Sequence, residues 1–292
     1  MNNKYSSKEY DEDKKKYRQK KLALINDLAG YGRCAISVQL PIVSALKVQC
    51  CPLPTSIFSN NTAFKEYYME DFTKNMLPYM EAWEKNRFKF DGICTGFLGS
   101  PEQVSVIETF FEKFKTKDTV VVVDPIMGDN GKLYAASTEE MCSKLKALVG
   151  YADICTPNLT EACALTDTPY KEKWNRKEIA ELAENVLKLG CHKVVITGIV
   201  QGSFIANYCC ERAGNDCITG GYVRCRKAGT QRCGTGDVFT AVIAAEAVKG
   251  TDFREAVKKA AVFVKKCIER SVELDIPLTD GVCFEELLTE LR

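Results

Sequence analysis

The sequence predicts an α/β protein with a mainly parallel central sheet and helices on both faces. Residues 119–124 (TVVVVD) form an apolar, β-branched run without alternation, which is typical of a strand buried on both faces. Similar runs recur along the chain, and segments with helical spacing of apolar residues separate them. The chain has 292 residues, 46% of them hydrophobic, which is enough for a large α/β core.

Strands and helices alternate over most of the length. Strands are expected at residues 21–27, 50–58, 91–97, 119–124, 153–155, 193–197, 203–210 and 217–226. Helices are expected at residues 33–47, 69–86, 101–115, 138–149, from about 159, 177–189, from about 237, 253–271 and after 277. Pro52 and Pro54 indicate that the second strand is near an edge of the sheet or irregular. Residues 214–216 (GND) predict a hairpin turn between the last two strands.

Charge and targeting signals narrow the classes of partner. The formal net charge is +1, so nothing indicates a nucleic-acid partner. No apolar run reaches the length of about 18 residues that a membrane span requires, and we expect no membrane segment. Residues 1–20 lack the apolar stretch of a secretory signal, so they are predicted to be a disordered leader before a single domain at residues 21–292.

Cysteine and histidine usage excludes several chemistries. The chain has 15 cysteines, none spaced as C-x-x-C, and its one histidine is His192. A zinc site of ordinary spacing is therefore not expected, nor is a nucleophile–histidine mechanism. His192 is better explained as a connector between a helix and a strand. The cysteines are predicted to be reduced, small apolar residues of a cytoplasmic protein.

The stretch CGTGD, Cys233 to Asp237, precedes a long apolar segment. It predicts a glycine turn that opens a buried helix, and free backbone N–H groups at such a helix start can hold an anion. Gly234, Thr235 and Gly236 would form the anion site. Asp237 in the first turn would be a poor phosphate ligand but a suitable general base for a hydroxyl that attacks a phosphate. An ordinary tight turn remains the alternative for so short a motif.

Polar or aromatic residues end the predicted strands. Ligands of open α/β sheets bind beyond the carboxyl ends of the strands, and we expect these residues to share one rim with the GTGD turn. The strand ends are Asp27, the loop at residues 59–62, Phe97, Asp124, residues 156–158 and Thr197.

Carboxylates on this rim suit a magnesium ion. Mg²⁺ is usually held by one or two carboxylates together with substrate phosphates, and Asp124, Asp129 and Glu161 could supply that charge. Two plain structural alternatives stay open. The GDNG segment around Asp129 also suits a simple turn, and Asn158 with Glu161 three residues later forms a capping-box pattern. No G-x-x-x-x-G-K-[ST] motif is present, so a kinase of this sequence would not use a Walker loop.

Seven motifs in order carry a family resemblance. The set IND, FSNNT, TGF, DPIMGDNGKLY, TPNLTEA, VVITG and GTGDVFTA resembles the ribokinase-like vitamin kinases, and most of all the pyridoxal/pyridoxamine kinases. The resemblance runs from about residue 21 to residue 271. It implies a ribokinase-like fold, ATP and a vitamin B6 form as substrates, Mg²⁺ with a monovalent cation such as K⁺, and a homodimer. TPNLTEA and GTGD are specific together and weak apart.

The resemblance also assigns roles to individual residues. Asp237 would take the proton from the 5′-hydroxymethyl group, and Gly234, Thr235 and Gly236 would stabilise the phosphoryl group in transfer. Residues that would serve the cations are Asp124, Asp129, Thr156 and Glu161. Residues that would contact ATP are Asn158 and Thr197. Residues that would line or cover the vitamin pocket are Asp27, Phe58, Ser59, Thr62, Phe97, Tyr134 and Cys233.

Two departures from the family pattern concern the substrate. Asp27 stands where many pyridoxal kinases have a serine near the ring nitrogen, and Asn61 replaces the histidine of the usual FSNHT motif. An aspartate there would favour a protonated ring or an aminomethyl group, so pyridoxamine is a candidate substrate. Rival functions are hydroxymethylpyrimidine kinase, NAD(P)H-hydrate dehydratase and a non-catalytic B6-binding protein. Asp237 favours the pyridoxal branch, since hydroxymethylpyrimidine kinases typically carry cysteine at that position.

Overall fold

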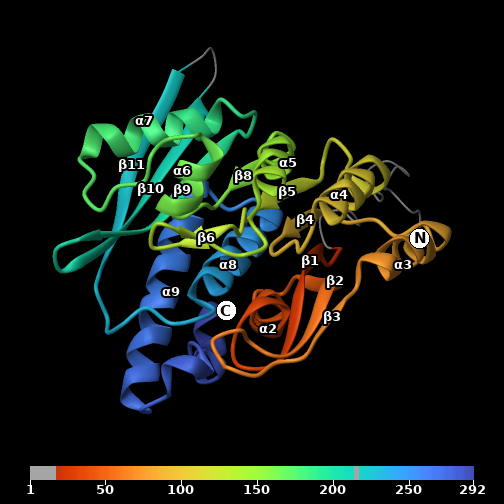
Figure 1. Cartoon of the computed structure of the whole chain (residues 1–292), viewed down its shortest axis with the longest axis horizontal. Helices are drawn as coiled ribbons and strands as arrows, with labels where there is room; N and C mark the ends of the chain where they lie inside the picture. Colours follow the sequence, from red (N-terminus) through yellow and green to blue (C-terminus); the bar gives the residue numbers. More distant parts are fainter. Residues whose placement is uncertain (1–17, 214–216) are drawn as a thin grey trace, which may run out of the picture.

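A nine-stranded sheet runs through the protein in a computed structural model that describes residues 18–213 and 217–292 (Figure 1). The strand order is β11-β10-β9-β8-β5-β4-β1-β2-β3. Its members are β1 (Lys21–Tyr31), β2 (Gln49–Asn60), β3 (Met69–Asp71), β4 (Gly92–Thr95), β5 (Val120–Val123), β8 (Ile154–Cys155), β9 (Lys193–Gln201), β10 (Phe204–Ala213) and β11 (Cys217–Arg226). The short strands β6 (Gly128–Asp129) and β7 (Lys132–Leu133) form a separate hairpin.

The interior of the large sheet is parallel, as predicted. Strands β2, β1, β4, β5, β8 and β9 pair in parallel, while β3, β10 and β11 pair antiparallel at the two edges. The edge position of Pro52 and Pro54 is confirmed: β3 pairs only with Ser56, Ile57 and Phe58 of β2, which leaves the proline stretch unpaired on that side.

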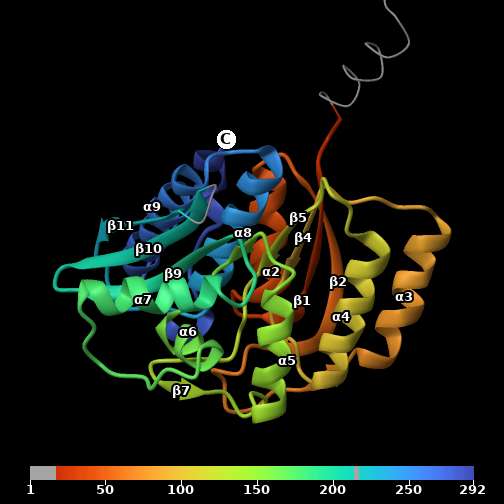
Figure 2. The same ribbon diagram turned by 90° about the horizontal axis from the view of Figure 1, so that it is seen from above.

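Helices cover both faces of the sheet (Figure 2). One face carries α3 (Thr73–Lys85), α4 (Pro101–Phe114), α5 (Glu139–Val149), α6 (Leu159–Leu165) and α7 (Arg176–Leu187). The other carries α2 (Ala35–Ala45), α8 (Thr235–Lys249) and α9 (Phe253–Glu273). The α/β class with helices on both faces is therefore confirmed. In the part of the chain that the structure describes, no helix is both long and apolar enough to cross a bilayer.

Two cores result from this arrangement, one on each side of the sheet. In β1, Ala23 and Ile25 belong to the core under α3–α7, whereas Leu22 and Leu24 belong to the core under α2, α8 and α9. Successive side chains of a strand point to opposite faces, so a strand buried on both sides needs an unbroken apolar run. Helix α8 is buried along most of its length, which explains why its sequence is apolar all round.

Strand β1 is longer than predicted, and this changes the shape of the site. The expected strand ended at Asp27, but β1 continues to Tyr31 beside β2, with an irregularity in the pairing between Asn26 and Leu28. Between the pairs Asn26–Pro54 and Leu28–Ile57, β2 has two residues where β1 has only Asp27, so Asp27 lies opposite an extra residue of β2. Such irregularities of pairing are frequent next to active sites.

Two further local predictions were wrong. The helix expected from Met69 begins at Thr73, because residues 69–71 pair with β2 as a short edge strand. The GDNG segment does form a turn, at the tip of the β6–β7 hairpin. The terminal helix expected after Pro277 consists of two 3-10 segments, η1 (Leu278–Asp280) and η2 (Glu285–Leu291). The predicted disordered leader falls mainly, and the hairpin turn at residues 214–216 wholly, outside the described residues.

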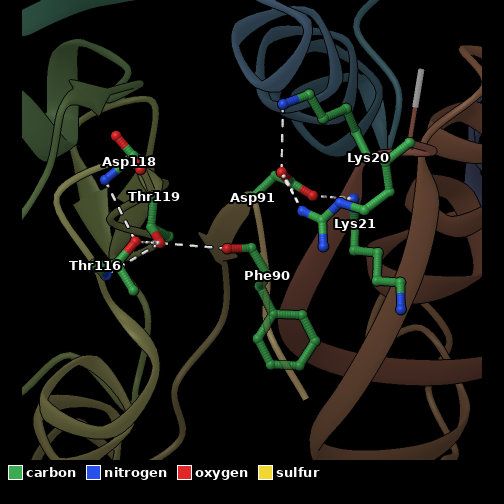
Figure 3. A network of polar contacts seen from close by, with 8 residues as sticks. Lys20, Lys21, Phe90, Asp91, Thr116, Asp118 and Thr119 are labelled. Atoms are coloured by element: carbon green, nitrogen blue, oxygen red, sulfur yellow. Dashed lines mark hydrogen bonds and ion pairs between the residues drawn. The ribbon is translucent and has the colours of Figure 1, made fainter. Parts of the chain in front are cut away.

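Asp91 aligns the first residues of central strands, at the end of these strands that lies opposite the candidate site (Figure 3). Its carboxylate accepts from the Lys21 backbone N–H at 2.9 Å and from the side chains of Arg18 and Lys20 at 2.8 and 3.3 Å. Partial burial raises the pKa of Asp91, but the Lys21 N–H and the two cations outweigh it, so its pKa is lowered. The backbone of Asp91 also bonds to Lys21 and Val120, which aligns β1, β4 and β5.

Candidate active site

The GTGD turn opens helix α8 as the sequence predicts. Gly234 is the N-cap residue with φ +83°, a left-handed conformation that glycine adopts without strain. A Cβ at Gly234 would lie 2.0 Å from the carbonyl oxygen of Arg33, so the starts of α8 and α2 are in direct contact. A Cβ at Gly236 would meet no atom within 4 Å. The helix start is therefore packed on one side and open at Gly236.

Asp237 lies where the N-termini of α8 and α2 meet. Its carboxylate accepts a backbone N–H from Ala35, the first residue of α2, and a hydrogen bond of 3.4 Å from Asn26 Nδ2. Burial raises the pKa of Asp237 to about 6, and these two hydrogen bonds oppose the rise. Ala35 has φ +51°, which is strained for a residue with a Cβ. The carboxylate is ionised at neutral pH and close enough to titration to accept a proton.

Asp27 faces the same space from β1, at the irregularity of its pairing with β2. Burial, together with the charge of Asp237, raises its pKa to about 7 against an opposing backbone hydrogen bond. Two carboxylates that share a site cannot both ionise freely, because each disfavours the charge of the other. Asp27 is thus poised to respond to a cationic group brought by a ligand.

Asp124 follows β5 and is 7% exposed. Thr240 of α8 donates a hydrogen bond of 2.7 Å to its Oδ2, and the Thr156 hydroxyl lies 3.2 Å from the Thr240 hydroxyl. Burial raises the pKa of Asp124 to about 7; the Thr240 hydrogen bond opposes the rise and the charge of Asp237 adds to it. Asp124 and Thr156 are therefore brought together through Thr240.

Glu161 completes a capping box at the start of α6, which confirms the structural alternative. The Asn158 side chain accepts from the Glu161 N–H at 3.0 Å, and Glu161 accepts from the Asn158 N–H at 2.8 Å. Glu161 also accepts from the Met127 N–H at 3.3 Å. Burial, followed by the charge of Asp124, holds the pKa of Glu161 well above its usual range. Capping and proximity to Asp124 thus coexist in one side chain.

The β6–β7 hairpin is anchored to the same helix start. Asn158 Nδ2 donates to the Gly128 carbonyl at 2.8 Å, so both ends of the predicted ATP ligand Asn158 are engaged within the protein. Asp129 accepts from Gln231 Nε2 at 2.9 Å, which joins the hairpin to the loop before the GTGD turn. Thr197 lies inside β9 rather than at its end, and its backbone pairs with residues 157–158.

The buried carboxylates fit a bound divalent cation. Asp124 and Glu161 are 7% and 5% exposed, and neither takes part in any ion pair among the described residues. Uncompensated buried charge is costly, and a hard cation with oxygen ligands would supply the missing positive charge. Within residues 18–213 and 217–292, no cluster of three or more His, Cys, Asp or Glu side chains is arranged as a metal cage. Magnesium bound largely through substrate phosphates needs no such cage.

Aromatic side chains from β2 and from the segment after β4 form one wall. The rings of Phe58 and Phe97 lie 6.5 Å apart, edge to face. Ser59 instead turns toward β3, where its hydroxyl accepts from the Tyr68 N–H at 2.9 Å. Thr62 is exposed beyond the end of β2. The structure therefore brings the two phenylalanines together and directs the Ser59 hydroxyl away from them.

Tyr134 follows the β6–β7 hairpin and is 49% exposed. Partial burial raises the pKa of its phenol to about 12, and the nearby carboxylates, with Asp129 foremost, add to the rise. The exposed position of this side chain suits the predicted covering role, which stays a prediction.

The segment after α9 packs against the ends of β1 and β2 and accounts for Asn61. Asn61 Nδ2 donates to the Thr279 carbonyl at 2.8 Å, and a Cβ on Gly32 would lie 2.1 Å from the same Nδ2 atom. The Arg33 N–H donates to the Asp280 carbonyl at 3.1 Å. Asn61 therefore fastens the end of β2 to the C-terminal segment, and this departure from the family motif has a packing role.

Two thiols border the GTGD turn. Cys34, the N-cap residue of α2, and Cys233 interact by a hydrogen bond between their side chains. That contact raises the pKa of Cys34 and lowers the pKa of Cys233. Cys233 stands beside the turn with Cys34 as a partner that the sequence did not indicate, and its predicted place in the wall of the vitamin pocket stays a prediction.

Sequence reasoning missed Asn26, Gln39 and Thr240. Asn26 bonds to Asp237 and Gln39, and Thr240 bonds to Asp124. One signal was available for Asn26: a polar residue at the end of an apolar strand run. Thr240 and Gln39 look like ordinary helix residues, and only the packing of α8 and α2 shows their function.

The fold is that of the ribokinase-like vitamin kinases. A solved structure from Bacteroides thetaiotaomicron VPI-5482, provisionally described as a phosphomethylpyrimidine kinase, is similar with a TM-score of 0.90 and 34% identity over 94% of each chain. Another crystal form of that protein was obtained with pyridoxal, and the similarity is a TM-score of 0.89.

The family match covers most of the chain. The family model for phosphomethylpyrimidine kinase matches residues 35–278, and the chain belongs to this family. The pyridoxal kinase of Dictyostelium discoideum is 28% identical over 160 residues, 53% of this chain and 51% of the relative. The hydroxymethylpyrimidine/phosphomethylpyrimidine kinase of Bacillus subtilis (strain 168) is 26% identical over 62% of this chain and 65% of the relative. The chain thus matches about half to two thirds of the length of these relatives.

Proposed function

We propose that the protein transfers the γ-phosphoryl group of ATP to the 5′-hydroxymethyl group of a vitamin B6 form. One observation carries the proposal: the Asp237 carboxylate is held between two helix N-termini, beside the open backbone at Gly236. A positioned base next to an anion-binding helix start is what phosphoryl transfer to an alcohol requires. The Bacteroides relative obtained with pyridoxal supports this substrate class.

Asp237 acts as the general base. Its pKa of about 6 leaves it ionised at neutral pH. It takes the proton from the substrate hydroxyl while the hydroxyl oxygen attacks the γ-phosphorus and ADP departs, so the products are the 5′-phosphate, ADP and a proton released later to water. Backbone N–H groups of Gly234, Thr235 and Gly236 would stabilise the developing charge on the transferred group. The Thr235 N–H donates to the Arg232 carbonyl at 3.4 Å and would have to exchange this weak bond for one to the phosphoryl group.

The carboxylates of the rim would hold the cations that accompany ATP. Asp124 and Glu161, with Thr156 and Asp129 nearby, would hold Mg²⁺, and K⁺ is the candidate monovalent ion. Bound Mg²⁺ supplies positive charge that offsets the phosphates of ATP. The positive charge of a bound cation would lower the raised pKa values of Asp124 and Glu161, so both carboxyl groups would ionise.

The two substrates approach from opposite sides of the turn. On the nucleotide side, Asn158 lies at the start of α6 and Thr197 lies within β9. Their backbone N–H groups donate to Glu161 and to the Pro157 carbonyl, so contact with the phosphates of ATP would require these bonds to change partner. On the vitamin side, the wall of Phe58 and Phe97 offers ring contacts, and Asp27 offers a carboxylate to a ring nitrogen or an aminomethyl group.

Hydroxymethylpyrimidine kinase activity is the second candidate. The description of the matching family and the Bacillus subtilis relative favour it. Both substrates are flat heteroaromatic rings with a hydroxymethyl group, so the same base and anion site serve either one. Asp237 in place of the cysteine typical of hydroxymethylpyrimidine kinases favours the B6 form.

A coupled ADP-release assay decides between these substrates. Purified protein with Mg²⁺-ATP is tested in parallel with pyridoxal, pyridoxamine, pyridoxine and hydroxymethylpyrimidine. Highest kcat/KM on a B6 form supports the proposal, whereas turnover restricted to hydroxymethylpyrimidine replaces it with the second candidate. Absence of ADP release with all four compounds contradicts both.

A further inference from the structure

Asn26 is fully buried, with all its hydrogen-bonding positions engaged around Asp237. Its Oδ1 accepts from the backbone N–H groups of Phe97 at 2.7 Å and Asp27 at 3.0 Å. Its Nδ2 donates to Gln39 Oε1 at 2.9 Å and to Asp237 Oδ1 at 3.4 Å. A single side chain thus joins β1, the segment after β4, α2 and the start of α8.

Chemistry fixes which way this amide faces. Backbone N–H groups can only donate, so the oxygen of Asn26 must face Phe97 and Asp27. The NH₂ group must then face Gln39 and Asp237. The amide of Asn26 packs directly on the backbone of Gly96, where a Cβ would lie 2.5 Å from it. The donor presented to Asp237 is therefore held in place by groups that belong to the fold.

We infer that Asn26 is a positioning residue for Asp237, and this inference rests on the proposed function in which Asp237 is the base. Asn26 acts through two effects: it holds the carboxylate in one orientation, and its NH₂ group favours the ionised form. It also links the base to the backbone of Phe97, whose ring forms the proposed substrate wall. Thr55 Oγ1 donates to the carbonyl of Phe97 at 2.9 Å, so both the backbone N–H and the backbone C=O of Phe97 are held by side chains.

The electrostatic surroundings show why a donor is needed. The titratable groups whose charge acts together with that of Asp237 are all acids, neutral or negative but never positive. They are Asp27, Cys34, Cys94, Asp124, Tyr134 and Cys233. Among the described residues, the donors to the Asp237 carboxylate are Asn26 and the N–H of Ala35. Removing the Asn26 donor leaves the peptide N–H to oppose burial.

Gln39 supports this arrangement from α2. Its Oε1 accepts from Asn26, whereas its Nε2 has no hydrogen-bond partner among the described residues. Rotating the Gln39 amide would pair Nε2 with an oxygen placed at the Asn26 Nδ2 position. The variant Asn26→Asp offers such an oxygen, so Gln39 can adapt to it and Asp237 cannot.

The test is the pH profile of kcat/KM for Asn26→Asp. This variant keeps an oxygen for the two backbone N–H groups and replaces the NH₂ donor by a second oxygen facing Asp237. We expect the acidic limb of the profile, near pH 6 in the wild type, to move upward by about one unit, with a lower rate at neutral pH. A limb at the wild-type position with unchanged kcat overturns the inference.

The matched control is Gln39→Met, which removes the other partner of Asn26 with little change in volume. If the effect is confined to Asn26 and Asp237, the acidic limb of Gln39→Met should stay at its wild-type pH. A shift of this limb as large as that in Asn26→Asp would assign the effect to packing and overturn the inference. Thermal unfolding verifies the fold of each variant. If Asn26→Asp does not fold, Asn26→Ser takes its place, since its hydroxyl can accept a backbone N–H but is too short to serve Asp237.

A direct titration separates this inference from the proposed function. The carboxyl carbon of Asp237 is followed by carbon-13 NMR in aspartate-labelled protein and assigned by its loss in Asp237→Asn. A higher pKa in Asn26→Asp supports the inference even if no vitamin is phosphorylated. Equal titration in both proteins overturns it even if the vitamin kinase activity is found.

Discussion

Thr240 donates a hydrogen bond of 2.7 Å to Asp124, and this contact ties the interior of α8 to the end of β5. Thr240 is 1% exposed and Asp124 is 7% exposed. The carboxylate is thus buried with a neutral hydroxyl as its partner and without a cation among the described residues. Such a group favours its protonated form until a cation arrives, which couples protein stability to pH and to ligand binding.

We expect Asp124→Asn to stabilise the ligand-free protein at alkaline pH. The pKa of Asp124 is about 7 in the folded protein against an ordinary 3.8, so the folded state binds more protons between these values. The free energy of unfolding therefore falls as pH rises from about 4 to about 7, and the stabilisation from the proton is lost above the folded pKa. Denaturant unfolding at pH 8 should show the variant to be more stable, by about 1.4 kcal/mol for each unit of pKa shift removed.

The exposed Asp118 supplies the control for this experiment. Asp118→Asn should leave the pH dependence of stability as it is in the wild type. Addition of MgCl₂ with ADP at pH 8 should raise the Tm of the wild type more than that of Asp124→Asn. An Asp124→Asn variant that is equally or less stable at pH 8 would contradict the assigned electrostatics.

Asp237→Asn should retain the fold and nucleotide binding but lose turnover. The amide cannot accept the substrate proton, so kcat is expected to fall roughly 10²-fold or more. In the wild type, the rate should rise with pH through about 6, because the base works only when ionised. Steady-state kinetics across pH 5 to 8, with ADP binding measured by calorimetry, checks both points. Near-wild-type turnover would remove Asp237 from this role.

The two glycines of the turn should respond differently to alanine. Gly234→Ala forces a Cβ to within 2.0 Å of a backbone carbonyl at φ +83°, so loss of stability is expected. Gly236→Ala meets nothing within 4 Å, and alanine favours the helix by up to about 1 kcal/mol. Its methyl group would instead occupy the open side, where the phosphoryl group is proposed to lie.

Thermal unfolding and ADP release together separate the two effects. Gly234→Ala should lower the Tm, whereas Gly236→Ala should keep the Tm and raise the KM for ATP or lower kcat. A fully active Gly236→Ala enzyme would mean that the transferred group does not approach this part of the backbone.

The sequence was sufficient for the parallel sheet but not for the rim of the site. Unbroken apolar runs such as residues 119–124 define strands because both faces of the sheet are covered. The continuation of β1 past Asp27 depends on a bulge and on pairing with β2, and no local pattern encodes it. The short strand at residues 69–71 likewise exists because an edge was available.

The candidate site divides in the same way. GTGD and the capping box of α6 are local motifs, so the sequence located Asp237 and Glu161 correctly at helix starts. Asn26 and Thr240 contribute through contacts 211 and 116 residues away in the chain, which only tertiary packing creates. Asn61 illustrates another case: the sequence shows it as a departure from the family motif, and the structure shows that it fastens the C-terminal segment.

Asp27 should set the preference among B6 forms. Burial and the charge of Asp237 raise its pKa to about 7, so the group is only partly ionised in the free protein at neutral pH. A cationic ring nitrogen or aminomethyl group would stabilise its charge, and that interaction is available to pyridoxamine more than to pyridoxal.

We expect Asp27→Asn to lower kcat/KM for pyridoxamine by about tenfold, equivalent to about 1.4 kcal/mol, while the value for pyridoxal changes less. Parallel ADP-release kinetics with both vitamers measure the ratio, and the exposed Asp118→Asn protein corrects for charge removal as such. Because the same substitution relieves repulsion on Asp237, the acidic limb of the rate should also move to lower pH. Equal losses for both vitamers would place Asp27 outside substrate discrimination and leave it as an electrostatic neighbour of the base.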